Sequence, residues 1–171
     1  QVLLIDTLHP TRRRLLGAGA AALALPGCAA LAPADAPGAL VKPPRLRDGD
    51  TIGLISTGTR LSDDWIADAV RNVQAAGFRV RLAANVQAVH GHYSGTVQQR
   101  VDALHALWAD GDVRALWSVR GGAGTANLLP HLDWAALRRD PKPVLGYSDA
   151  TALHLGLLRH AGLVCFHTLA A

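Results

Sequence analysis

From residue 51 onward, short apolar segments alternate with longer stretches in which apolar side chains recur at helical spacing. Strands are predicted at 51–55, 78–82, 113–119, 144–147 and 163–166, and helices at 63–76, 96–108 and 150–160. Strands separated by helices of this length pair in parallel through right-handed crossovers, and helices then cover both faces of the sheet. The sequence therefore predicts an α/β domain with a mostly parallel, flavodoxin-like or Rossmann-like sheet. The last helix is apolar almost all round, which predicts that it is buried.

The segment before this domain has the pattern of an export signal. Three adjacent arginines at 12–14 precede an apolar, uncharged run at 17–25 that is too short to span a bilayer. Cys28 follows Leu25-Pro26-Gly27, which resembles a lipoprotein processing site and makes Cys28 a candidate for lipidation. An Arg-rich tail before a short apolar helix is the alternative interpretation. The predicted organisation is an export signal at 1–28, an Ala- and Pro-rich linker at 29–44, and the folded domain at 45–171.

The net charge of +4 does not predict binding to nucleic acid. Three of the 17 basic residues stand at 12–14, and the others nearly balance the acidic residues without forming a basic stripe that contains aromatic residues. Cys165 lies in an apolar run and is predicted to be a small buried side chain that need not pair with Cys28. The spacings of cysteine and histidine give no tetrahedral metal site, and we expect neither a metal nor an organic cofactor.

Two loops that follow predicted strands carry the candidate chemistry. The first, Arg120-Gly121-Gly122-Ala123-Gly124, has three glycines that let backbone N–H groups approach a ligand closely. Its spacing is not that of a Walker loop, and a plain tight turn explains it equally well. In the second, Gly146-Tyr147-Ser148-Asp149, a strand ends and a helix begins, so Ser148 stands where a nucleophile elbow presents a hydroxyl. A helix N-cap at Ser148 or Asp149 is the alternative interpretation.

Four segments in a fixed order carry a resemblance to a known family. They are 49–56 (Gly-Asp-Thr-Ile-Gly-Leu-Ile-Ser), 91–100 (from Gly-His-Tyr-Ser-Gly-Thr to Gln-Arg), 120–124 and 141–154. Together they resemble the N-terminal domain of the LD-carboxypeptidases, also called muramoyltetrapeptide carboxypeptidases. The resemblance implies that Ser148 is the nucleophile. It also implies that the backbone N–H groups of Asp149 and of the Gly121-Gly122 turn form the oxyanion hole.

The resemblance further implies hydrolysis of the bond to the terminal D-alanine of murein tetrapeptides, in cell-wall recycling. In the family, a C-terminal domain contributes the His and Glu that activate the serine, whereas this sequence contains no Glu. We therefore expect that a domain absent from this chain supplies the pair, and that the chain alone is almost inactive. Of the eight histidines only His167 remains a candidate base, because His154 lies six residues beyond Ser148 and should face elsewhere. Ala123 and Thr168 depart from the family pattern.

Two other functions remain open. An exported ligand-binding lipoprotein would use the glycine turn to hold an anionic ligand without chemistry. A microcin-immunity peptidase of the same superfamily would share Ser148 but act on a different leaving group. The export signal predicts the periplasm or a lipid anchor in the membrane, whereas the resemblance implies the cytoplasm as the alternative. The sequence does not decide whether the protein forms a homodimer.

Overall fold

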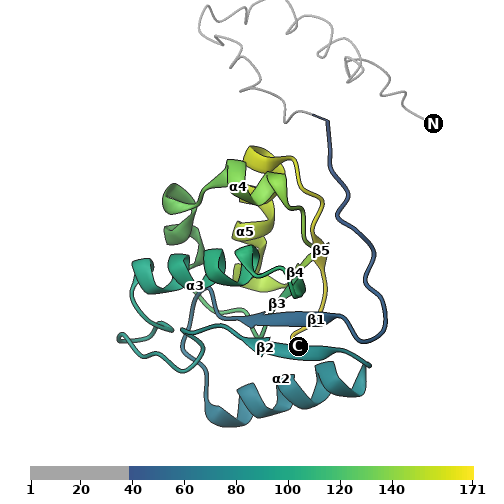
Figure 1. The fold of residues 1–171 in the computed structure, drawn as a ribbon. Helices are drawn as coiled ribbons and strands as arrows, with labels where there is room; N and C mark the ends of the chain where they lie inside the picture. The colour runs from purple at the N-terminus through teal and green to yellow at the C-terminus, as the bar shows by residue number, and fades with distance from the viewer. Residues whose placement is uncertain (1–38) are drawn as a thin grey trace, which may run out of the picture. The chain divides into compact units, whose positions relative to one another are not determined.

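Five parallel strands form a single sheet in the order β2-β1-β3-β4-β5 (Figure 1). The strands are β1 (Thr51–Ile55), β2 (Arg79–Leu82), β3 (Val113–Ser118), β4 (Val144–Gly146) and β5 (Phe166–His167). Every neighbouring pair is parallel. This order is the flavodoxin-like arrangement of a doubly wound sheet, and it confirms the predicted fold class.

The computed structural model describes residues 39–171. The predicted export signal with Cys28 lies outside these residues, as does most of the predicted linker. The end of the linker range contacts the domain, because Val41 N–H donates to the carbonyl of Gly162 at 2.8 Å and the Val41 carbonyl accepts from Val164 N–H at 3.0 Å. The backbone contacts of the domain therefore begin before residue 45.

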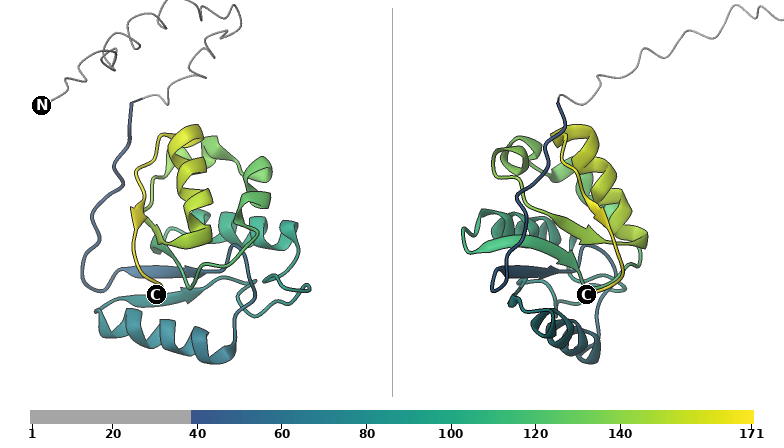
Figure 2. Two further views of the ribbon diagram at one scale, coloured as in Figure 1. Left: turned by 180° about the vertical axis from the view of Figure 1, so that it is seen from behind. Right: turned by 90° about the vertical axis from the view of Figure 1, so that its right-hand side faces the viewer.

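Helices cover both faces of the sheet. They are α2 (Asp63–Ala75), α3 (Val97–Ala109), α4 (Trp134–Arg139) and α5 (Thr151–Gly156), with the shorter turns η1 (Thr125–His131), η2 (Ser148–Ala150) and η3 (Leu157–Ala161). Figures 1 and 2 show α2 on one face and α3, α4 and α5 on the other. Within residues 39–171, none of the helices is long and apolar enough to cross a membrane.

The two long helices begin at polar caps that the sequence supplies locally. The hydroxyl of Ser62 accepts from Trp65 N–H at 3.4 Å, so Ser62 is the N-cap of α2. Thr96 and Gln99 form a reciprocal capping box at the start of α3. These contacts fix where each helix leaves its preceding loop, and both loops border the carboxyl edge of the sheet.

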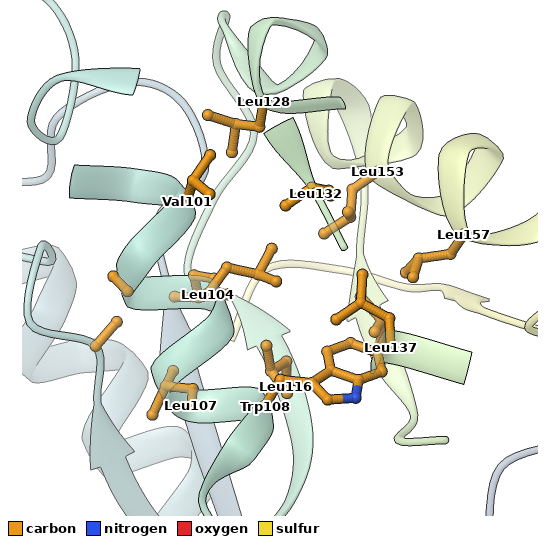
Figure 3. Packing of buried hydrophobic residues seen from close by; sticks show 14 of the residues in the cluster. Val101, Leu104, Leu107, Trp108, Leu116, Leu128, Leu132, Leu137, Leu153 and Leu157 are labelled. Carbon is orange, nitrogen blue, oxygen red and sulfur yellow. The ribbon is translucent and has the colours of Figure 1, made fainter. Parts of the chain in front are cut away.

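The larger hydrophobic core lies between the sheet and the helices α3, α4 and α5 (Figure 3). Leu104 of α3, Leu116 of β3 and Leu157 of η3 are completely buried there. A smaller core on the other face joins Ala69 and Val73 of α2 to the sheet. The two cores hold the sheet rigidly from both sides, so the loops at its carboxyl edge start from fixed positions.

The last predicted helix is irregular and only partly buried. It begins as the 3₁₀ turn η2, continues as α5 and ends as the π-turn η3, after which Gly162 adopts a φ of 65°. Leu155 is 60% exposed and Leu158 is 38% exposed, so the prediction of burial all round is wrong for this face. The last strand is also displaced, because Leu163 bridges Val41 while β5 pairs with β4 three residues later.

Truncation of Leu104 tests the larger core. We expect Leu104→Ala to lower the free energy of unfolding by about 2–5 kcal/mol, since the side chain is completely buried and leaves a cavity. Leu155→Ala is the matched control and should change it by no more than about 0.5 kcal/mol, as an exposed substitution does. Urea denaturation followed by circular dichroism measures both. Equal losses for the two variants would contradict this description of the core.

Candidate active site

Three loops meet at the carboxyl edge of the sheet, one after each of the strands β1, β3 and β4. The chain order reverses between β1 and β3, and open α/β sheets bind ligands at such a reversal. The loop after β1 begins at Ser56, the glycine turn begins at Arg120, and the loop after β4 contains Ser148. The fold thus brings together the two segments that the sequence singled out, and adds the loop after β1.

Ser148 occupies a strained position at the junction of β4 and η2. Its φ of 54° is the one positive value among the non-glycine residues of the described chain. Such a conformation costs roughly 1–3 kcal/mol and persists where surrounding contacts impose it. The side chain is exposed rather than directed into the core. The predicted sharp turn therefore presents a hydroxyl to solvent at the edge of the sheet.

Gly121 lies directly against Ser148. A Cβ atom added to Gly121 would stand 2.6 Å from the Cβ and 2.9 Å from the Oγ of Ser148. Only a residue without a side chain lets the two backbones approach this closely. The structure therefore places the serine side chain directly against the backbone of the glycine turn.

The glycine turn is held in place from the other side by Thr59. Gly122 has a φ of 145°, and a Cβ atom there would collide with the Thr59 side chain. The Thr59 hydroxyl accepts from Ala123 N–H at 3.0 Å. The turn is therefore fixed between the loop after β1 and Ser148, and Ala123 takes part through its backbone.

The carboxylate of Asp149 has a positioning contact that the sequence did not predict. Its Oδ2 accepts from the backbone N–H of Thr125 at 3.0 Å and from the Thr125 hydroxyl at 2.7 Å. The Thr125 hydroxyl also lies 2.7 Å from the Thr57 hydroxyl. One carboxylate thereby connects the loops that follow β1, β3 and β4, while the Asp149 N–H stands at the start of η2, beside Ser148. Thr57 could be suspected from the sequence because polar residues directly follow a buried strand.

Arg100 is a second residue that the sequence analysis missed. It is 2% exposed, and its Nη1 donates to the carbonyls of Thr57 at 2.7 Å and Gly124 at 3.1 Å. Its guanidinium also lies 4.9 Å from the centre of the Tyr93 ring. Burial lowers the pKa of Arg100, and the phenol of Tyr93 and the carboxylate of Asp149 oppose this shift. The signal in the sequence was its helical spacing with Leu104, which places it on the buried face of α3.

The histidines of the described chain do not hydrogen-bond to Ser148. His154 is 8% exposed, its Nε2 is buried without a partner, and a Cβ atom added to Gly146 would lie 3.9 Å from that nitrogen. Burial, and then the proximity of His167, lower the pKa of His154. His167 itself is exposed on β5. His154 is thus buried beside Gly146 and is not hydrogen-bonded to Ser148.

Cys165 is half-buried against the larger core and unpaired in the described chain. Burial raises the pKa of its thiol to about 12, so the thiolate needed for nucleophilic attack is disfavoured. Among residues 39–171 there is no group of three or more side chains that could hold a metal ion.

Comparison with known proteins agrees with this geometry. The family described as LD-carboxypeptidase N-terminal domain matches residues 52–168. The chain belongs to the LD-carboxypeptidase family. The match includes β1, the glycine turn and Ser148, and so covers all three loops of the site.

Several relatives and a solved structure are similar to this chain over less than half of their own length. The chain is 34% identical to the murein tetrapeptide carboxypeptidase of Pseudomonas aeruginosa, over 68% of this chain and 38% of that protein. It is 32% identical to the microcin C7 self-immunity protein MccF of Escherichia coli, over 70% of this chain and 36% of that protein. A crystal structure of an MccF-like protein from Bacillus anthracis has a TM-score of 0.72 at 30% identity, covering 76% of this chain and 40% of that one. The chain therefore spans less than half the length of these LD-carboxypeptidase relatives.

A methyl group at Gly121 tests the close approach to Ser148. We expect Gly121→Ala to destabilise the domain by about 1–3 kcal/mol, because the added atom overlaps the serine side chain. A crystal structure of the variant should show Ser148 Oγ displaced. Gly111→Ala is the matched control, since a Cβ atom there meets nothing within 4 Å. Equal stability of the two variants would contradict the contact.

The buried imidazole of His154 predicts a pH dependence of stability. Its pKa is lowered in the folded state, so the unfolded state binds the proton more tightly and the stabilising contribution is complete above about pH 6.5. It is lost as the pH falls below that value. Urea denaturation between pH 5 and 7.5 should show this loss, and His154→Gln should reduce it. The exposed His131→Gln should leave the pH dependence unchanged; a flat profile for the unsubstituted protein would contradict the prediction.

Proposed function

We propose that the full-length protein is a serine LD-carboxypeptidase that releases the terminal D-alanine of murein tetrapeptides. The observation that carries the proposal is the strained, exposed Ser148 in contact with Gly121. Strained backbone of this kind concentrates at functional sites, because a purely structural residue would relax or be replaced by glycine. Membership of the family and similarity to a murein tetrapeptide carboxypeptidase support the choice of substrate.

The reaction follows from the placement of the hydroxyl. Ser148 Oγ attacks the carbonyl carbon of the L-centre, and the carbonyl oxygen becomes an oxyanion that the N–H groups of Asp149 and of the Gly121-Gly122 turn stabilise. Collapse of this intermediate breaks the C–N bond, and the amine of D-alanine leaves with a proton. Water then attacks the acyl-serine ester, releases the shortened peptide and restores the hydroxyl.

A serine hydroxyl needs a base to accept its proton. No histidine of residues 39–171 hydrogen-bonds to Ser148, and the sequence contains no Glu. The chain spans 38% of the length of the Pseudomonas relative. Our proposal therefore includes a His–Glu pair supplied by a C-terminal domain, with the chain of 171 residues contributing the nucleophile and the oxyanion donors.

A second candidate function is that of a microcin-immunity peptidase. The similarity to MccF of Escherichia coli favours it, at nearly the same identity as the murein enzyme. It would use the same serine on an acyl group attached to a different leaving group. A ligand-binding protein without chemistry is less well supported, since binding alone gives no reason for a strained serine at the glycine turn.

Replacement of the proposed nucleophile is the direct test. In the full-length protein, Ser148→Ala should lower the rate of D-alanine release from a murein tetrapeptide by at least about a thousandfold, as loss of a nucleophile does. Liquid chromatography of the products measures the rate. Binding of the peptide to Ser148→Ala, followed by calorimetry, is the control for folding. Unchanged hydrolysis would overturn the proposal, and hydrolysis of microcin-type substrates alone would favour the second candidate.

A further inference from the structure

A cleft of about 730 Å³ opens between the loop after β1, the start of α2 and Arg120. Its lining includes Arg60, Asp63, Trp65, Gln87, Val89 and Arg120. It lies at the reversal of strand order between β1 and β3, where the fold favours ligand binding. None of its lining residues belongs to the nucleophile and oxyanion groups already described, so the cleft is a separate part of the same edge.

The cleft is lined by two arginine side chains and by one carboxylate. Arg60 and Arg120 form no ion pair within residues 39–171, whereas Arg71, Arg81 and Lys142 each contact an aspartate. The one carboxylate in the lining, Asp63, already accepts a hydrogen bond from Gln87 at 3.3 Å. An anion that enters the cleft would therefore meet a net positive charge from the two arginines and the one aspartate of the lining.

The guanidinium of Arg120 is held in a fixed orientation. Its Cζ lies 3.6 Å from the centre of the Trp65 ring, and its Nε is buried without a hydrogen-bond partner. Stacking on an aromatic ring restricts the plane of the guanidinium but leaves the N–H groups at its edge free to donate. A guanidinium oriented in advance binds a carboxylate with two parallel hydrogen bonds at low entropic cost.

Arg120 is also coupled to the nucleophile by the chain itself. It directly precedes Gly121, whose backbone lies against Ser148, and its carbonyl accepts from the Ser118 hydroxyl at 2.8 Å. Arg120, which lines the cleft, is therefore adjacent in the chain to the residue whose backbone lies against Ser148. A peptide whose scissile carbonyl reaches Ser148 would therefore pass close to Arg120.

We propose that Arg120, assisted by Arg60, binds a carboxylate of the peptide substrate. The inference rests on the proposed peptidase function and adds the group that recognises the substrate. Two carboxylates fit this chemistry, the C-terminal one on the leaving residue and one within the remaining peptide. Both are planar anions that accept a bidentate pair from arginine.

The test measures binding without turnover, in full-length protein that carries Ser148→Ala. Three peptides are compared by calorimetry: the tetrapeptide acid, its C-terminal amide, and the acid with its internal carboxylates amidated. Arg120→Gln should weaken binding of the acid by roughly 10- to 100-fold, as loss of charge-assisted hydrogen bonds does. Arg120→Gln should leave unchanged the affinity for the peptide in which the recognised carboxylate has been amidated. The peptide that becomes insensitive identifies which carboxylate is recognised.

Two further variants keep the test decisive. Arg114→Gln removes an exposed arginine from β3, on the strand that leads to Arg120, and should not change the affinity of any peptide. Arg120→Lys keeps the charge but loses the planar fork, and should retain only part of the preference for the acid. Equal effects of Arg120→Gln on all three peptides would overturn the carboxylate assignment. Hydrolysis assayed in the Ser148-containing protein separates the two proposals, since it depends on Ser148 whether or not Arg120 selects a carboxylate.

Discussion

The hydrogen bonds of the Asp149 carboxylate hold the site together. They join Thr125 to the loop that carries Ser148, and the Thr125 hydroxyl contacts Thr57 in the loop after β1. Each of these loops starts from a different strand, and nothing in their local sequence fixes the distance between them. Because Thr125 and Thr57 are buried, an unpaired hydroxyl or carboxylate there would be costly, and this cost favours the one arrangement that satisfies all of them.

Arg100 extends the same constraint from α3. A buried guanidinium is expensive unless its donors are satisfied, and here the acceptors are carbonyls of Thr57 and Gly124 rather than a directly bonded carboxylate. Carbonyl acceptors leave its positive charge uncancelled, and the carboxylate of Asp149 opposes the lowering of the Arg100 pKa that burial causes. The helix α3, the glycine turn and the loop that carries Ser148 are thus coupled through one buried polar network. A change at any of them is expected to move the others.

The elements of this fold that depend on local sequence were predictable, and those that depend on distant contacts were not. The strand at 51–55 follows from an apolar run, and the helix at 96–108 follows from apolar side chains at helical spacing. The sharp turn at Ser148 follows from its place between a predicted strand and a predicted helix. The contact of Asp149 with Thr125 joins residues 24 apart, and Arg100 reaches a carbonyl 43 residues away. The periodic spacing of apolar residues carries no information about such long-range polar contacts. The exposure of Leu155 was missed because apolar composition does not state which face a neighbouring element covers.

Glycine at two positions leaves room for the strained serine and for the start of the helix that follows it. Gly121 leaves room for the side chain of Ser148, as the overlap of an added Cβ atom shows. Gly146 leaves room for the side chains of Ala150 and Ser118. A Cβ atom at Gly146 would stand 2.9 Å from the Cβ of Ala150 and 3.0 Å from that of Ser118. Gly146 stands two residues before Ser148, as the first glycine of the G-x-S-x-G elbow does, and Ala150 occupies the place of its second glycine. The elbow therefore depends on a close packing of strand end against helix start, and Ala150 is compatible with it only while residue 146 is glycine.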